Sequence, residues 1–410
     1  MVPLDDSSRS TRRSVLHRAA TAVAIGLTTG LSGCSGLPPL GDKPQYGRVD
    51  IPDPGPPEYR RWLPAGWDSD TDEDWFLTYV EPGPFDGPVP EELVSRRAVQ
   101  RRDLEYLGIG YENYDSLTRT TLATVREGTF SADTVRSTLA DSGYEPDGTY
   151  RDYDLYARSD ISRRVAVRDG VVVSTSASLH RTPDLEATID AGDGQTERYH
   201  EVDPIFEAVT DAVGASRLLS IGDHPSLNPT VAALGADAFR VDGDAAYHVL
   251  LEQYPETVEQ PGERMKSAIE DEHYTGMAAA DTIDIGVDGR LATAGARVPL
   301  QPDEPRDFVH DPPQITWGVA FDAETSTVTL RYELGPELDA DRLWYDLVPV
   351  DAVNRIENQP LWPDRDTVGP GDETTVEMSD RPDADGVDVR WGPKDDPGMR
   401  LFSYVPQRTE

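Results

Sequence analysis

The stretch Arg164-Val165-Ala166-Val167-Arg168-Asp169-Gly170-Val171-Val172-Val173-Ser174-Thr175 decides how most of this chain folds. Two valine-rich runs flank Asp169-Gly170, and a two-residue Asp-Gly turn between such runs is a strong short-range signal of an antiparallel β-hairpin. The turn needs positive φ at its centre, which glycine adopts without steric penalty. The sequence therefore predicts two paired strands here.

The residues around this hairpin predict a regular alternation of strands and helices. Leu122–Gly128 has the composition of a strand, Ser131 caps a helix that runs to Ser142, and Tyr150–Arg158 alternates as a strand does. A second helix is expected over Pro183–Ala191. This order is typical of an α+β fold, in which we expect an antiparallel sheet with helices on one face.

A weaker echo of the same order follows along the chain. We expect a helix over Val202–Ala215, a strand over Arg217–Ile221 and paired strands within Ala236–Gln253. A helix over Gly262–Asp271 and a hairpin on Asp288-Gly289 complete it. Residues 59–300 thus form the predicted α+β domain. Whether it is a duplicated unit, with halves 59–200 and 201–300, stays open, because two Asp-Gly turns can arise independently.

The sequence before this region adds one strand and one helix. Trp75–Val80 is rich in aromatic and β-branched residues and predicts a strand. Glu91–Leu107 begins with two acids and continues with arginines, which predicts a helix.

After the proline-rich segment 301–313, residues 314–410 predict only strands. Short apolar and β-branched runs with turn residues between them predict a C-terminal β-sandwich. The runs are Ile315–Phe321, Thr327–Leu334, Leu343–Val350, Gly371–Met378, Val387–Trp391 and Arg400–Val405.

Part of this region resembles the β-domain of haloarchaeal type IV pilin-like proteins. The resemblance is carried by Phe321-Asp322-Ala323-Glu324 before Val328-Thr329-Leu330, by Gly369-Pro370-Gly371-Asp372, by Val389-Arg390-Trp391 and by Leu401-Phe402-Ser403-Tyr404. Gly335-Pro336-Glu337 stands where that family usually has Gly-Gly-Asp. The resemblance implies a sandwich used for display or adhesion.

The N-terminus resembles a twin-arginine export signal that ends in a lipobox. Arg12 and Arg13 precede the apolar run Ala19–Leu31, and Leu31-Ser32-Gly33-Cys34 matches the lipobox pattern. A transmembrane helix needs about 20 predominantly apolar residues, and this run is shorter and contains threonines and glycines. We therefore expect residues 1–33 to be an export signal peptide, Cys34 to carry a lipid, and residues 34–58, rich in proline and glycine, to be a linker.

Composition limits the partners of the chain. It carries 76 acidic and 38 basic residues, a formal net charge of −38, and its lysines are only Lys43, Lys266 and Lys394. Such a charge repels nucleic acid and anionic membrane surfaces. An excess of acids with few lysines resembles the halophilic proteins of haloarchaea, whose surface repulsion is screened in molar salt, so we expect low salt to loosen the fold. With 1 cysteine there is neither an intrachain disulfide nor a cysteine metal site.

No pattern of catalytic or metal-binding residues stands out. His200-Glu201-Val202-Asp203 lacks the second histidine of a zincin motif, and Gly214-Ala215-Ser216-Arg217-Leu218 lacks the second glycine of a nucleophile elbow. Asp242-Gly243-Asp244 and Asp383–Asp388 are shorter than a full calcium loop. Trp62, Trp67 and Trp75 could line a sugar or peptide groove, although core packing is the simpler interpretation.

We therefore expect a lipid-anchored surface protein on the extracellular side of the cell membrane, held there through Cys34. Its expected role is that of a non-catalytic binding or structural module of the envelope, with an envelope protein as a potential partner and with no cofactor, metal or nucleic acid. The alternatives are an extracellular hydrolase and a solute-binding protein of a transport system. Paired carboxylates could serve a hydrolase, but among 76 acids the sequence selects no pair, so whether the protein is an enzyme stays open.

Overall fold

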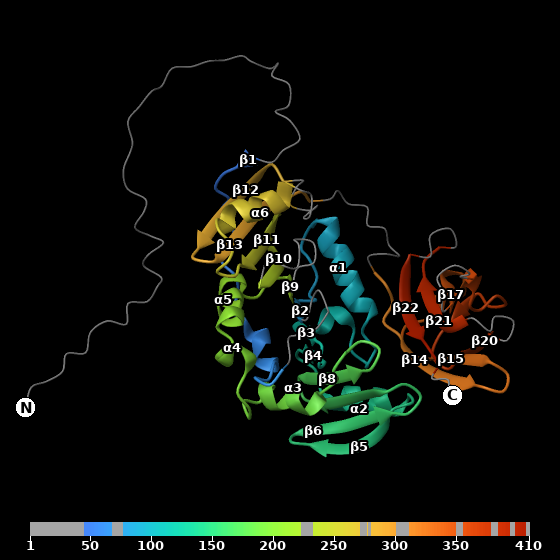
Figure 1. Cartoon of the computed structure of the whole chain (residues 1–410). Helices are drawn as coiled ribbons and strands as arrows, with labels where there is room; N and C mark the ends of the chain where they lie inside the picture. The colour runs from blue at the N-terminus through green and yellow to red at the C-terminus, as the bar shows by residue number, and fades with distance from the viewer. Residues whose placement is uncertain are drawn as a thin grey trace, which may run out of the picture. The chain divides into compact units, whose positions relative to one another are not determined.

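The computed structural model shows a mixed α and β protein in which strands predominate (Figure 1). The chain divides into two units, Met1–Asp42 and Lys43–Glu410, and every described residue belongs to the second. The structure describes residues 45–67, 77–222, 233–270, 277, 280–300, 311–349, 356–378, 384–393 and 398–406.

A 13-stranded sheet is the largest element, and its strand order is β1-β12-β13-β11-β10-β9-β2-β3-β4-β8-β7-β6-β5. All pairings within it are antiparallel except the short β1–β12 pair, which is parallel. The predicted hairpin on Asp169-Gly170 is present as β7–β8, and Gly170 has φ +73°. The strands are β1 (Gln45–Tyr46), β2 (Leu77–Val80), β3 (Ser116–Thr120), β4 (Thr124–Glu127), β5 (Glu145–Tyr150), β6 (Tyr153–Arg158), β7 (Arg163–Arg168), β8 (Val171–Ser176), β9 (Leu218–Gly222), β10 (Leu234–Asp242), β11 (Ala245–Gln253), β12 (Thr282–Asp288) and β13 (Leu291–Val298).

Helices pack on both faces of this sheet, so the prediction that they share one face was wrong. Adjacent residues of a strand point to opposite faces. On β8, Val172 packs with α2, whereas Val173 packs with α3. The β8 run has no polar alternation because both of its faces are covered, and this is why the sequence did not reveal the second layer. The helices are α1 (Glu91–Arg102), α2 (Ala132–Ala140), α3 (Leu185–Gly192), α4 (Tyr199–Val202), α5 (Pro204–Val213) and α6 (Pro261–Glu270).

The two halves of the sheet have the same strand order. Strands β2, β3, β4, β7 and β8, with α2 between β4 and β7, lie in the order β2-β3-β4-β8-β7. Strands β9 to β13, with α6 between β11 and β12, lie in the order β9-β10-β11-β13-β12. Strands β2 and β9 pair antiparallel with each other at the centre of the sheet. From this pair, the corresponding strands of the two halves follow in the same order towards the two edges of the sheet. This correspondence favours a duplicated unit, although the domain boundaries stay predictions.

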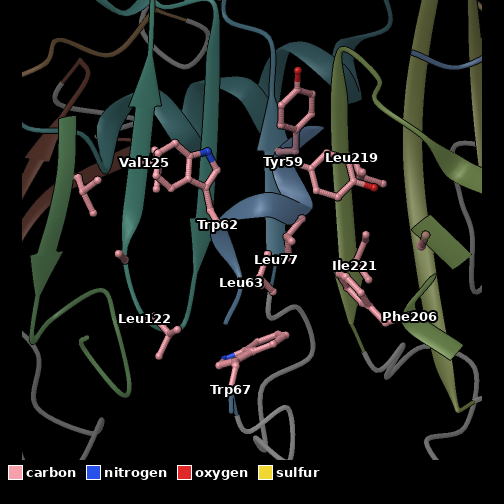
Figure 2. Close-up of a cluster of buried hydrophobic side chains, with 14 of the residues drawn as sticks. Tyr59, Trp62, Leu63, Trp67, Leu77, Leu122, Val125, Phe206, Leu219 and Ile221 are labelled. Carbon is pink, nitrogen blue, oxygen red and sulfur yellow. The ribbon is translucent and has the colours of Figure 1, made fainter. Parts of the chain in front are cut away.

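The largest core lies on the face that carries α3 and α5. Trp62 and Trp67, which precede β2, pack there against strand residues such as Val125 and Leu219 and against Phe206 of α5 (Figure 2). Both indoles are also anchored by polar contacts, since Trp62 Nε1 donates to Glu127 at 3.0 Å and Trp67 Nε1 to Thr121 at 2.8 Å. These tryptophans are therefore core residues, and Trp75 lies outside the described residues.

The C-terminal strands form smaller antiparallel sheets with a common core. Trp317, Tyr332 and Val389 belong to one buried cluster, which draws on all three of these sheets because it also includes Val368. The sheets are β14-β15-β20, β16-β19 and β18-β17-β21-β22. Their strands are β14 (Thr316–Asp322), β15 (Thr327–Leu334), β16 (Leu338–Asp339), β17 (Leu343–Pro349), β18 (Ile356–Pro360), β19 (Thr367–Val368), β20 (Glu373–Glu377), β21 (Ala384–Trp391) and β22 (Met399–Tyr404).

The second part of the predicted linker contacts the large sheet. Gly47 N donates to Ile283 O at 2.9 Å, and Arg240 Nη1 donates to Pro52 O at 2.8 Å. Gly55 and Ala215 form an isolated β-bridge. Proline and glycine here shape a strap along the sheet, so residues 45–57 do not act as a spacer.

Candidate functional site

One face of the large sheet carries a row of polar side chains beneath α1. Directly opposite residues of antiparallel strands point to the same face. Ser220 of β9 lies opposite Thr78 of β2, Thr78 opposite Arg119 of β3, Arg119 opposite Thr124 of β4, and Thr124 opposite Ser174 of β8. We call these residues the polar lane. Its hydroxyl-bearing members are buried.

Two cavities lie along the polar lane. The first, of about 120 Å³, is named the Arg126 cavity, and its lining includes Arg126, Thr124, Ser174, His180, Trp317 and Phe402. The second, of about 510 Å³, is named the Thr78 cavity, and its lining includes Thr78, Gln100, Arg119 and Ser220. Asp103, Ser178 and Leu179 line both cavities, so the two spaces adjoin.

Arg126 is the central group of the smaller cavity. Its side chain points from β4 to the same face as Thr124, it is 2% exposed, and neither Nε nor Nη1 has a hydrogen-bond partner in the described part of the chain. A guanidinium stays charged at any pH a protein meets. An unpaired buried charge is costly, which makes Arg126 a group that needs an anion.

The carboxylates that line the Arg126 cavity are already engaged elsewhere. Asp103 binds Arg119 at 2.6 Å and Arg102 at 3.1 Å. Glu105 pairs with Arg163 and accepts a hydrogen bond from the Tyr144 hydroxyl. The positive charge of Arg126 is therefore left over in a cavity whose acids are neutralised.

Trp317 adds a second unpartnered donor from the C-terminal sheets. Its side chain is 2% exposed, and Nε1, which can only donate, has no partner among the described residues. Its strand is held against the first part of the chain, because Thr316 Oγ1 donates to Tyr106 O at 2.7 Å and Gln314 Oε1 accepts from Tyr111 N at 2.7 Å. These contacts fix the position of Trp317 at the cavity wall.

His180 positions the hydroxyl of Thr124. Its Nδ1 lies 2.9 Å from Ser176 N and 3.2 Å from Ser176 O, and the shorter contact favours the tautomer in which Nδ1 accepts and the Nε2 hydrogen is donated to Thr124 Oγ1 at 3.0 Å. The Thr124 hydroxyl hydrogen is then free to point to another acceptor. Burial lowers the pKa of His180 to about 4, and the charges of Arg119 and Arg126 act in the same direction. His180 is thus neutral at ordinary pH.

The chemistry of the Arg126 cavity is that of a hydrogen-bond donor site. Arg126, Trp317 and Thr124 all offer hydrogens, and the carboxylates at its wall have arginine partners. Such a site binds oxygen acceptors, and best an anion, because charge-assisted hydrogen bonds are the strong ones.

A second buried polar cluster lies in the other half of the sheet, and its carboxylate is paired. Asp237 of β10 binds His248 of β11 at 2.8 Å and Arg96 of α1 at 3.0 Å. Burial alone would raise the pKa of Asp237, but His248 and Arg96 outweigh it and hold this pKa well below its usual range. We interpret this cluster as the ionic link that holds α1 to the sheet.

Among the described residues that the sequence highlighted, His200, Asp203 and Asp242-Gly243-Asp244 line neither cavity. Cys34, Arg12 and Arg13 lie outside the described residues. Asp203 caps α5 by accepting from Ile205 N and Phe206 N, both at 2.8 Å, and His200 lies on the preceding short helix α4. Asp242-Gly243-Asp244 is the turn between β10 and β11, and Asp383 lies outside the described residues. Asp203 thus serves as a helix cap, and Asp242-Gly243-Asp244 serves as a turn.

Within the ranges that the structure describes, no group of three or more histidine, cysteine, aspartate or glutamate side chains is arranged to hold a metal ion. In the same ranges, no helix has the length and apolar character needed to cross a membrane.

Comparisons with known proteins give only distant structural likenesses. No protein-family model matches the chain, and no curated protein matches it in sequence. Three crystal forms of TP0453 are similar in structure. Form I has TM-score 0.37 and 10% identity, and covers 60% of this chain and 94% of that one. Form III has TM-score 0.34 and 12% identity, with coverages of 62% and 95%, and form IV has TM-score 0.34 and 11% identity, with coverages of 60% and 94%. These scores assign neither a fold family nor a function.

The sequence did not single out Arg126, His180 or Trp317. One local signal was present, since Thr124 and Arg126 alternate with apolar Val125 inside a predicted strand whose two faces are therefore chemically different. The other residues that line the Arg126 cavity, such as His180 and Trp317, lie far along the chain from Arg126. No local sequence pattern connects them with it.

Proposed function

We propose that this protein is an exported, lipid-anchored binding protein of the cell envelope that holds a small anionic ligand in the Arg126 cavity. The observation that carries the proposal is the buried guanidinium of Arg126, whose Nε and Nη1 have no hydrogen-bond partner among the described residues. The chain has a net charge of −38, so its overall composition does not explain a buried positive group in a cavity. Such a group suits a ligand of negative charge.

The remaining parts of the proposal come from the sequence. Arg12 and Arg13 mark the export signal, and Cys34 the lipid anchor on the extracellular side. We also propose that the C-terminal sheets form a β-sandwich, supported by the core that Trp317 and Tyr332 share with Val389. This module would supply Trp317 to the cavity, as well as a display surface of the kind that the pilin-like resemblance implies.

The anion proposal is tested by titrating the mature chain with potassium acetate, phosphate and succinate at constant high ionic strength. Binding is followed by calorimetry and by tryptophan fluorescence, and chloride is varied as a competitor. We expect saturable binding of at least one anion. Arg126→Met should weaken it by tenfold or more, since a hydrogen bond to a charged group contributes about 1.5–3 kcal/mol.

Arg136→Met is the matched control. Arg136 lies on α2, where it pairs with Asp133 and Asp154, and its loss should leave anion affinity unchanged. Binding that survives in Arg126→Met, or no binding by any of these anions, would contradict the proposal.

The anchor is tested separately by Cys34→Ser. Without the thiol that receives the lipid, the protein should leave the membrane fraction and be found in the medium. Full membrane retention of Cys34→Ser, measured by fractionation and immunoblotting, would exclude lipidation as the anchor.

A further inference from the structure

The space beside Arg126 is larger than a simple inorganic anion needs. The Arg126 cavity, of about 120 Å³, adjoins the Thr78 cavity, of about 510 Å³, at Asp103, Ser178 and Leu179. A ligand whose charged group sits at Arg126 would therefore extend past these residues into the larger cavity.

Hydroxyl and amide side chains make up a large part of the lining of the larger cavity. Thr78, Thr120, Ser178 and Ser220 contribute hydroxyl groups, and Gln100 of α1 contributes an amide. Each of these groups can both donate and accept hydrogen bonds. The Thr120 hydroxyl already bonds to the backbone of Leu122 and Ala123, and the Ser178 hydroxyl lies 2.8 Å from that of Ser176. Thr78, Ser220 and Gln100 are therefore the groups offered to a ligand, and sugar hydroxyls have the same dual character.

Each charged side chain that lines the larger cavity has a partner of opposite charge. Arg119 binds Asp103, and Arg96 binds Asp237. The walls that separate the hydroxyl groups are apolar, with Val99, Leu218 and Leu179, and such side chains suit the C–H faces of a pyranose ring. The larger cavity thus matches a neutral, hydroxylated body, and the Arg126 cavity matches a single anionic group.

The polar lane also has the length that such a ligand requires. From Ser220 of β9 to Thr124 of β4 it crosses β2 and β3. Neighbouring strands lie about 4.8 Å apart, so this distance is roughly 14 Å. The lane is longer than one pyranose ring.

We propose that the ligand is a polyhydroxylated carboxylate, that is, an acidic sugar such as a hexuronate or a short oligosaccharide ending in one. This inference rests on the proposed function, because it uses the same Arg126 cavity. The sugar carboxylate accepts from Arg126, Trp317 and Thr124, and its hydroxyls bind along Thr78 and Ser220.

The experiment compares potassium glucuronate, galacturonate, glucose and acetate by calorimetry on the mature chain at constant high salt. Glucuronate or galacturonate should bind at least tenfold more tightly than acetate. Glucose, which lacks the carboxylate, should bind more weakly than either uronate. Arg126→Met should remove the advantage of the uronates over glucose.

Thr78→Val and Ser220→Ala delete hydroxyls at the far end of the lane. Each should weaken uronate binding roughly threefold to tenfold and leave acetate binding unchanged, because one neutral hydrogen bond is lost. Thr118→Val is the matched control, since Thr118 is a buried threonine of β3 opposite Tyr79, on the other face of the sheet. It should change neither affinity.

The outcomes separate this inference from the proposed function. If acetate or phosphate binds through Arg126 and uronates bind no more tightly, the sugar inference is overturned and the anion site stands. If uronates bind tightly but Thr78→Val and Ser220→Ala leave their affinity unchanged, the placement along the lane is wrong. If no anion binds, both proposals fail.

Discussion

The two halves of the large sheet share a strand order but differ in what they bury beneath the helices. In the first half, Ser174 and Ser176 of β8 face the Arg126 cavity. In the second half, Ala292, Ala294 and Ala296 of the corresponding strand β13 pack into an apolar cluster with α6. The same strand order thus gives a cavity in the first half of the sheet and a filled apolar core in the second. The difference follows from the side chains at alternate positions of one strand in each half, which are serines in β8 and alanines in β13.

The halves differ in their buried charges as well. Asp237 in the second half has both His248 and Arg96 as partners, whereas Nε and Nη1 of Arg126 in the first half have none among the described residues. A paired charge stabilises only as long as its partners remain, and an unpaired one destabilises until a ligand arrives. Under the proposed function, the second half is organised for stability and the first for binding.

The largest expected effect is that of Asp237→Asn. Removing this carboxylate leaves Arg96 with only the partly exposed Glu92 as a counterion, and breaking a buried pair costs about 3–5 kcal/mol. Urea unfolding at constant molar salt should show a loss of this size. Arg126→Met should show no loss or a gain, because it removes an unpaired charge. Equal losses in the two variants would contradict the contrast between the halves.

Acid should destabilise the first half through His180. Its pKa is about 4 in the folded chain and 6.5 in the reference state. Below pH 6.5 the unfolded chain takes up the proton first, so stability falls as the pH drops towards 4. The full effect is roughly 3 kcal/mol. His180→Gln should be less sensitive over this range, and the difference between the two pH profiles of urea unfolding isolates this one residue from the many carboxylates. Parallel profiles would contradict the burial of a neutral imidazole.

Making the second half resemble the first should also destabilise it. Ala294 is fully buried, and Ala294→Ser places a hydroxyl in an apolar cluster, where an unsatisfied polar group costs about 1–3 kcal/mol. Thermal unfolding at fixed salt measures this. An unchanged melting temperature would mean that the α6 side has room for polar groups.

The reverse exchange should have the smallest effect. Ser174 Oγ makes only a long contact of 3.5 Å with Thr124 O, so Ser174→Ala should change the free energy of unfolding by less than about 1 kcal/mol. Its effect should appear in anion affinity instead, measured by calorimetry. A large loss of stability would assign Ser174 a structural role.

The local structure of the large sheet followed from local patterns. The β7–β8 hairpin was predictable because Asp169-Gly170 fixes its own turn geometry, and α2 was predictable because Ser131 caps it by accepting from Asp133 N at 3.1 Å. The helix predicted to reach Leu107 ends at Arg102, because Asp103 instead binds Arg102 and Arg119. The end of this helix was therefore set by the contact between Asp103 and Arg119 of strand β3.

The sequence by itself determined the strands, the Asp-Gly turns, the capped helices and the expectation of an exported, anchored chain, because each depends on residues within a short segment. Only the tertiary structure decided that helices cover both faces of one 13-stranded sheet, that the strap of residues 45–57 lies along it, and that Arg126 and Trp317 line one cavity. These depend on contacts between residues far apart in the chain. A buried charge without a partner is visible only when every neighbour is known, and for this reason the proposed binding site follows from the fold and not from a motif.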